Sequence, residues 1–157
     1  MSRIGIRFAL FCTALASSVS SEAADYTFPT AALKSLEAAY TARDIEAAVA
    51  ARDFAAEARE MLLAISKGDT TISKDPGILK QTADVLEKGY RLEMKSKGFP
   101  SMATLSCQIV ETTPKRPDLV PMLETGIWPD QSRSTETVYA IKTPTGWKII
   151  TLPQTGA

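Results

Sequence analysis

The pattern of hydrophobic and polar positions divides this chain into a helical first part and a strand-rich second part. Between residues 30 and 98 apolar side chains recur every three or four positions, which is typical of amphipathic helices. From Ala103 to Leu152 the period changes to two, which is typical of β-strands. Helices and strands in separate blocks predict an α+β fold, with three to four N-terminal helices packed on a curved antiparallel sheet of about four strands.

The first predicted helix begins at a Thr30 cap and ends near Arg43. Its inward positions, spaced three and four residues apart, are Leu33, Leu36 and Tyr40. Asp44 then suits the N-cap of a second helix, because its short carboxylate can accept a hydrogen bond from the first free backbone amides.

The run over residues 44–65 is predicted to break at Arg52–Asp53. At about 100° per residue, Phe54 lies about 180° around the helix from Ile45, and the apolar positions that follow stay on the side of Phe54. A single straight helix would leave one of these apolar faces in water. Burying the second face stabilises the protein by several kcal/mol at roughly 25 cal/mol per Å², so we expect a bend with Asp53 capping a new helix.

A polar loop is expected over Lys67–Lys74, followed by a helix that begins with Asp75 as N-cap and Pro76 in its first turn. Gly98 should end this helix. The predicted strands cover residues 103–112, 118–128, 134–143 and 147–152. Pro121 within the second of them indicates a bulge or an edge position, because proline donates no hydrogen bond.

The first 23 residues have the features of a secretory signal peptide. Arg3 and Arg7 precede the apolar run Phe8–Ala16, which is too short to span a bilayer, and a Ser-rich stretch leads to Ser21-Glu22-Ala23. We therefore expect a signal peptide over residues 1–23, cleaved after Ala23, and a single domain over residues 24–157. The mature protein would be periplasmic or secreted and would not insert into the membrane.

Composition excludes several functional classes. The chain has 18 basic and 18 acidic residues, so no net positive charge favours binding to nucleic acid. It has no histidine, which excludes histidine-based catalysis and histidine metal ligands. After signal cleavage Cys107 is the remaining cysteine, and its place in an alternating run favours a buried structural thiol over a reactive one.

Acidic side chains are the first candidates for catalytic or metal-binding groups. Asp53, Glu57 and Glu60 could form an acid–base or metal site, but Arg59 lies among them and a solvated charged face is the better interpretation. The sequence therefore predicts no catalytic residue, no metal ligand and no cofactor.

Aromatic residues are the candidates for a pocket or an interface, with a place in the core as the alternative. They are Tyr40, Tyr90, Trp128, Tyr139 and Trp147. The loops over residues 67–75 and 112–118 are where a partner would dock, because loops on a rigid scaffold often carry recognition.

Three segments resemble the nuclear transport factor 2-like superfamily. The helix break in Leu36–Val49 is similar to its opening, and Thr135–Lys142 and Gly146–Ile150 are similar to its closing strands. This resemblance implies a cone-shaped α+β fold, related to the cystatin-like folds, in which a curved sheet surrounds a central helix. The run Asp44–Ala58 resembles a bacterial branch of immunity proteins, which implies protection of the producing cell by binding a toxin.

The same superfamily contains ketosteroid isomerase-like and SnoaL-like enzymes. The resemblance would place their catalytic tyrosine at Leu36 and their aspartate base in the region Phe54–Arg59, which here reads as helix. Neither catalytic role can be transferred to this chain.

Two specific functional hypotheses follow, beside a third in which the chain is a structural envelope protein with no discrete ligand. The first is a secreted, non-enzymatic binding protein, an immunity protein whose partner is a toxin or effector protein; a homodimer through the sheet stays open. The alternative is a small apolar ligand-binding or isomerase-like protein that uses the hollow of the cone. That alternative requires a deep pocket with a buried acid near Tyr90, Tyr139 or Trp147.

Overall fold

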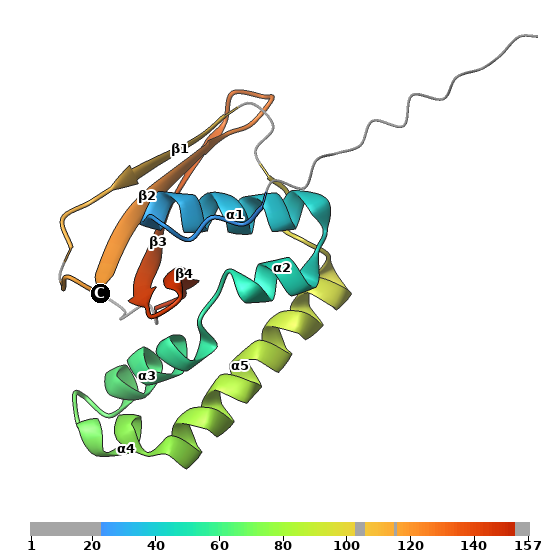
Figure 1. Ribbon diagram of the computed structural model, residues 1–157. Helices are drawn as coiled ribbons and strands as arrows, with labels where there is room; N and C mark the ends of the chain where they lie inside the picture. Colours follow the sequence, from blue (N-terminus) through green and yellow to red (C-terminus); the bar gives the residue numbers. More distant parts are fainter. Residues whose placement is uncertain (1–22, 103–105, 115, 153–157) are drawn as a thin grey trace, which may run out of the picture.

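The computed structural model describes residues 23–102, 106–114 and 116–152, and it shows helices packed against a four-stranded antiparallel sheet (Figure 1). The predicted α+β class is therefore confirmed. The elements are α1 (Pro29–Ala42), α2 (Ile45–Ala50), α3 (Phe54–Ile65), α4 (Thr70–Lys74), α5 (Pro76–Lys97), β1 (Ser106–Glu111), β2 (Leu119–Ile127), β3 (Arg133–Thr143) and β4 (Gly146–Ile150). Most of the expected signal peptide and the side chain of Cys107 lie outside the described part of the chain.

Helix α1 begins two residues earlier than the sequence suggests. Its N-cap is Phe28, which makes no side-chain cap, and Pro29 occupies the first turn. The predicted Thr30 cap is wrong because proline, with its fixed φ and missing amide hydrogen, already suits the first helical position. The predicted end is confirmed: Arg43 adopts the left-handed conformation with φ 55°, and the Asp44 amide donates to the carbonyl of Ala39 at 2.9 Å.

The predicted break at Arg52–Asp53 is confirmed. Helix α2 ends at Ala50 and α3 starts at Phe54. The Asp53 carboxylate accepts a hydrogen bond from the Ala56 amide at 2.8 Å, which caps α3 as expected.

The residues of this break also pair with the outer edge of β4. The Ile149 amide donates to the carbonyl of Ala51 at 2.9 Å, and the Asp53 amide donates to the carbonyl of Ile149 at 3.2 Å. Further along the same edge, the Trp147 amide donates to the carbonyl of Tyr26 at 2.8 Å. Two segments distant in sequence thus satisfy backbone groups that an edge strand would leave unpaired.

Helix α4 occupies the predicted polar loop over Lys67–Lys74. Its N-cap Asp69 accepts a hydrogen bond from the Thr71 amide at 2.8 Å, so this short segment gains a helical turn where only a loop was expected. The next helix follows the prediction: Asp75 caps α5, Pro76 lies in its first turn, and Gly98 ends it with φ 84°.

The sheet is a meander in the order β1-β2-β3-β4. The register of β2 with β3 passes through Pro121 without interruption, so the predicted bulge is wrong. β2 is also an interior strand of the sheet, but the pairing of β1 with β2 ends at Met122 and Pro121 lies just beyond it. There its carbonyl accepts a hydrogen bond from the Thr112 amide at 2.9 Å, and no amide hydrogen is needed in return.

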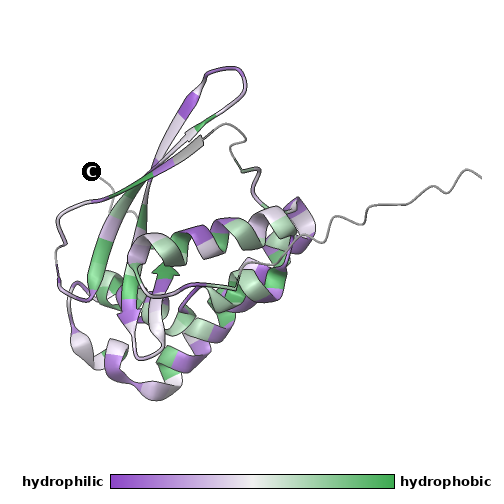
Figure 2. Cartoon of the chain, turned by 45° about the horizontal axis from the view of Figure 1, so that its top comes forward, coloured by the Kyte–Doolittle hydropathy of each residue, from purple (hydrophilic) through white to green (hydrophobic). Residues whose placement is uncertain are grey.

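The core lies where the helices cover the sheet, and Figure 2 shows apolar residues gathered there. The buried members include Leu33 and Leu36 of α1, Met122 of β2, and Ile149 of β4. The far end of the β2–β3 hairpin projects past this core and is more hydrophilic (Figure 2). Among the described residues, no helix combines the length and apolar character needed to cross a bilayer.

Candidate functional site

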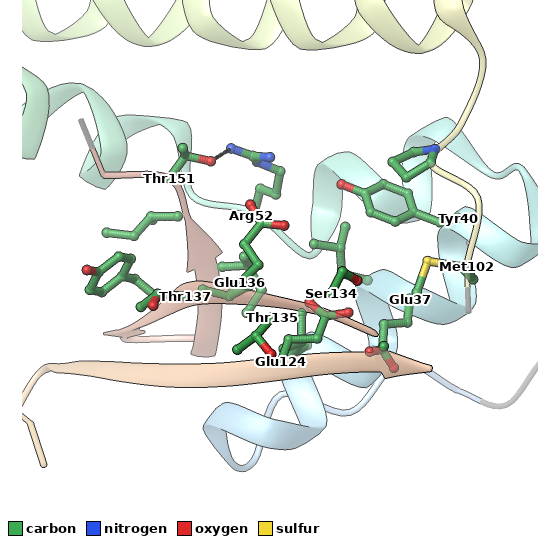
Figure 3. Close-up of a pocket in the computed structure, with 18 of the residues that line it drawn as sticks. Glu37, Tyr40, Arg52, Met102, Glu124, Ser134, Thr135, Glu136, Thr137 and Thr151 are labelled. Atoms are coloured by element: carbon green, nitrogen blue, oxygen red, sulfur yellow. Dashed lines mark hydrogen bonds between the residues drawn. The ribbon is translucent and has the colours of Figure 1, made fainter. Parts of the chain in front are cut away.

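A pocket of about 820 Å³ lies between α1 and the sheet (Figure 3). Its walls come from α1, the break at Arg52, the segment Pro100–Met102, and strands β2 to β4. β4 pairs with β3 only from Tyr139 to Thr143. The earlier part of β3, which leads away from the β2–β3 turn, therefore has β2 on one side and no strand on the other. The pocket lies along this part of β3.

The pocket wall is apolar and polar in about equal parts. The aliphatic side chains are Leu33, Leu36, Val138, Ile149, Ile150 and Leu152. Aromatic rings contribute from α1, from the hairpin and from β3, and they are Tyr40, Trp128 and Tyr139.

Three of the five predicted aromatic residues therefore line one pocket. Tyr90 does not line it but lies next to it, because its hydroxyl donates to the hydroxyl of Tyr40 at 2.9 Å. Trp147 packs against the core and does not line the pocket. The structure thus brings Tyr40 and Tyr90 together and leaves Trp147 outside the pocket.

Arg52 lies at the inner end of the pocket. Its Nη2 donates to Glu57 Oε2 at 2.6 Å and to Thr151 Oγ1 at 2.8 Å, the second bond being drawn in Figure 3. The guanidinium carbon also lies 4.6 Å from the ring centroid of Tyr90 and 5.2 Å from that of Phe54. Such cation–π contacts hold the cation in place in an environment that contains little water.

Glu57 corrects the prediction of a solvated acidic face. The residue is only 7% exposed, and the same Oε2 accepts a second hydrogen bond from the Thr151 amide at 3.1 Å. Glu57 is buried because the start of α3 packs against the end of β4, which local spacing on a helix does not reveal.

The other two acids of that predicted face also have structural partners. Glu60 is half-buried and forms an ion pair with Arg116 at 2.8 Å, which ties α3 to the segment before β2. Asp53 caps α3. Each of the three carboxylates therefore has a structural partner within the domain.

Burial and neighbouring charges shift the pKa values of two groups here. Burial alone lowers the pKa of Arg52, but the attraction and hydrogen bond of Glu57 outweigh it, so the net pKa is raised and the guanidinium stays charged. Burial, followed by the hydrogen bond with Tyr40, raises the pKa of Tyr90 against the opposing charge of Arg52. The inner end of the pocket therefore contains the neutral phenol of Tyr90 and the ion pair of Arg52 with Glu57.

The raised pKa of Tyr90 predicts a loss of stability at alkaline pH. The folded state holds the phenolic proton more tightly than the unfolded state, so this contribution is fully present below the ordinary value of 10.0 and is lost as the pH rises through the folded pKa. We expect denaturant titrations above pH 10 to show a falling free energy of unfolding, with a shallower fall for Tyr90→Phe. Burial also raises the pKa of Tyr26, so some fall remains in the variant. Equal slopes for the two proteins would contradict the prediction.

Three carboxylates line the pocket in addition to the apolar side chains. Glu37 comes from α1, Glu124 from β2 and Glu136 from β3, and all three line the pocket (Figure 3). Glu37 and Glu124 each interact with other groups of the chain. Composition alone gives no sign of this cluster, because the acids lie on three different elements and the net charge of the chain is zero.

The described residues contain no group of three or more side chains that could hold a metal ion. Leu36, which stands at the position of the isomerases' catalytic tyrosine, is buried. Phe54–Arg59, the region of their aspartate base, lies within α3, as the sequence indicates. The pocket therefore combines apolar surface with charged side chains. The acid near Tyr90 is Glu57, whose carboxylate is already bonded to Arg52 and to the Thr151 amide.

The chain matches no protein-family model, no curated protein and no solved structure.

Proposed function

We propose that this protein is a non-enzymatic binding protein of the cell envelope, which holds a small, largely apolar ligand in the pocket between α1 and the sheet. The observation that carries the proposal is the pocket itself, whose volume of about 820 Å³ falls within the range of roughly 300–1,000 Å³ typical of small-molecule sites. The aliphatic and aromatic side chains that make up about half of its wall also suit the apolar part of such a ligand.

The hydrogen bonds already made by Glu57 and Tyr40 favour binding over catalysis. A general base must be free to take a proton from a bound substrate. Glu57 Oε2 already accepts hydrogen bonds from Arg52 and from the Thr151 amide. The Tyr40 hydroxyl is likewise engaged by Tyr90. These groups are suited to hold the pocket open and to fix its inner wall.

The envelope location and the family are part of this proposal. The location rests on the signal-peptide features of residues 1–23, and the family on the resemblance to nuclear transport factor 2-like proteins. A helix layer over an antiparallel sheet with a hollow beside α1 supports that resemblance.

The proposal is tested with N-phenylnaphthylamine, a neutral apolar fluorophore that brightens in apolar surroundings. We expect saturable binding with one site per chain. Val138→Trp should abolish it, because Val138 lines the pocket and an indole there would fill it. Val110→Trp is the matched control, because Val110 is 58% exposed on β1 and does not line the pocket. Absence of saturable binding to the unmodified protein, or equal loss in both variants, would refute the proposal.

A protein partner is the second candidate, as an immunity protein that binds a toxin. The observation that favours it is an apolar stripe on α5, where Ile78, Val85 and Leu92 recur every seven residues and are 40%, 63% and 66% exposed. Exposed Lys88 and Lys95 lie beside the stripe, so it suits a toxin surface that combines apolar and acidic groups.

Survival of a deletion strain against toxin-producing sibling cells tests this candidate. The intact gene should restore protection, and Leu92→Lys should not. Full protection by the Leu92→Lys variant, or survival of the deletion strain without any gene, would argue against an immunity role through this surface.

A further inference from the structure

Glu136 is the carboxylate of the pocket wall that is open to a ligand. It rises from β3 into the pocket (Figure 3), and the residue is exposed. Within the described part of the chain, Glu136 makes no ion pair and no side-chain hydrogen bond. Its negative charge is therefore available to a ligand that enters the pocket.

Glu136 faces a second carboxylate across the sheet. In the register of β2 with β3, Glu136 lies directly opposite Glu124, which interacts with another group of the chain. A cationic ligand at Glu136 would therefore lie beside two acidic side chains.

The cation already in the pocket does not neutralise this carboxylate. The Nη2 of Arg52 lies 2.6 Å from Glu57 Oε2, and both side chains are about nine-tenths buried. Because this pair is internally compensated, it offers little attraction to an anionic ligand. Glu136 therefore keeps its negative charge available to a ligand in the pocket.

Apolar surface begins next to Glu136. Val138 lies two residues further along β3 on the same face, because side chains alternate across a strand. Beyond it the wall continues with Leu36 of α1 and Ile149 of β4. A ligand with its charged end at Glu136 would therefore place an apolar chain against the inner wall.

We infer that the ligand is an amphipathic organic cation, an ammonium group on an apolar chain, with Glu136 as the anchor of the ammonium. This inference rests on the proposed function, because it names the ligand class of the same pocket. The ammonium group donates charge-assisted hydrogen bonds to the carboxylate, and the chain displaces water from the aliphatic wall.

The test compares dodecylamine, dodecanol and dodecanoate, which share one chain and differ in head-group charge, as competitors of N-phenylnaphthylamine at neutral pH. Direct calorimetric titration of the same three compounds accompanies the competition, each below the concentration at which it aggregates. We expect dodecylamine to bind about tenfold more tightly than dodecanol, the gain typical of a hydrogen bond to a charged group. Glu136→Gln should bring the two within about twofold of each other, and Glu136→Lys should reverse the order in favour of dodecanoate. Glu111→Gln is the matched control, because Glu111 lies on β1 outside the pocket.

The outcomes separate the inference from the function on which it rests. Equal binding of all three compounds, or strongest binding of dodecanoate to the unmodified protein, would overturn the cationic ligand class while leaving an apolar pocket. Failure of all three compounds and of the fluorophore to bind would overturn both. Tighter binding of dodecylamine that persists in Glu136→Gln would reject Glu136 as the anchor.

Discussion

Replacing Glu57 by alanine is expected to lower the free energy of unfolding by about 3–5 kcal/mol. The side chains of Arg52 and Glu57 are only 11% and 10% exposed, and their charged atoms lie 2.6 Å apart. Removing the carboxylate would leave a buried guanidinium without its counter-charge and the Thr151 amide without its acceptor. Breaking a buried ion pair in this way costs much more than the net contribution of the intact pair, because the remaining charge has lost its hydration and its partner.

Two variants make this result specific to the buried pair. Asp84→Ala removes the partner of Lys80 on the exposed side of α5, where the pair is worth at most about 1 kcal/mol. The double variant Arg52→Met with Glu57→Leu removes both charges and should recover most of the lost stability. Denaturant titration measures all three proteins. A loss for Glu57→Ala no larger than that for Asp84→Ala would show that the pair is not buried in solution.

The break that creates this pair could be predicted from the sequence. The change in apolar phase between Ile45 and Phe54 requires two helices, and Asp53 supplies the cap that starts the second. Both features depend on residues within one or two helical turns of each other. Local patterns of this kind also predicted the Asp75 cap, the Gly98 stop and the four strands.

The burial of Glu57 could not be predicted in the same way. Its local surroundings on α3, with Arg59 and Glu60 nearby, are those of a solvated face. Its partner Arg52 lies across the helix break, and its second donor is the amide of Thr151, near the other end of the domain. The sequence carries no local signal for a contact that forms only when β4 pairs with the break.

The pocket was predicted only in part for the same reason. Aromatic residues are good candidates for any pocket, and Tyr40, Trp128 and Tyr139 do line this one. The carboxylates, however, come together only through the three-dimensional arrangement, since Glu124 and Glu136 lie opposite each other through strand register. Strand register depends on the complete sheet, so their proximity is not visible in the order of residues.

Gly146→Ala is expected to cost about 3 kcal/mol, because two separate penalties act at this position. Gly146 has φ 115°, a conformation that residues with a Cβ rarely adopt. A Cβ at this position would also lie 2.7 Å from the carbonyl oxygen of Tyr26, the oxygen that accepts the hydrogen bond from Trp147. The substitution would therefore strain the turn between β3 and β4 and displace the segment that covers the edge of β4.

Two other glycines separate these penalties. Gly98 has φ 84° but open space where a Cβ would lie, so Gly98→Ala should cost only about 1 kcal/mol for the backbone alone. Gly89 lies within α5 with a negative φ and open space, so Gly89→Ala should stabilise the protein by about 0.5–1 kcal/mol. Thermal and denaturant unfolding of the three variants should rank them Gly89, Gly98, Gly146 in order of decreasing stability. If Gly146→Ala were no worse than Gly98→Ala, the collision with Tyr26 would be absent, and the N-terminal segment would not be held against β4 as the structure shows.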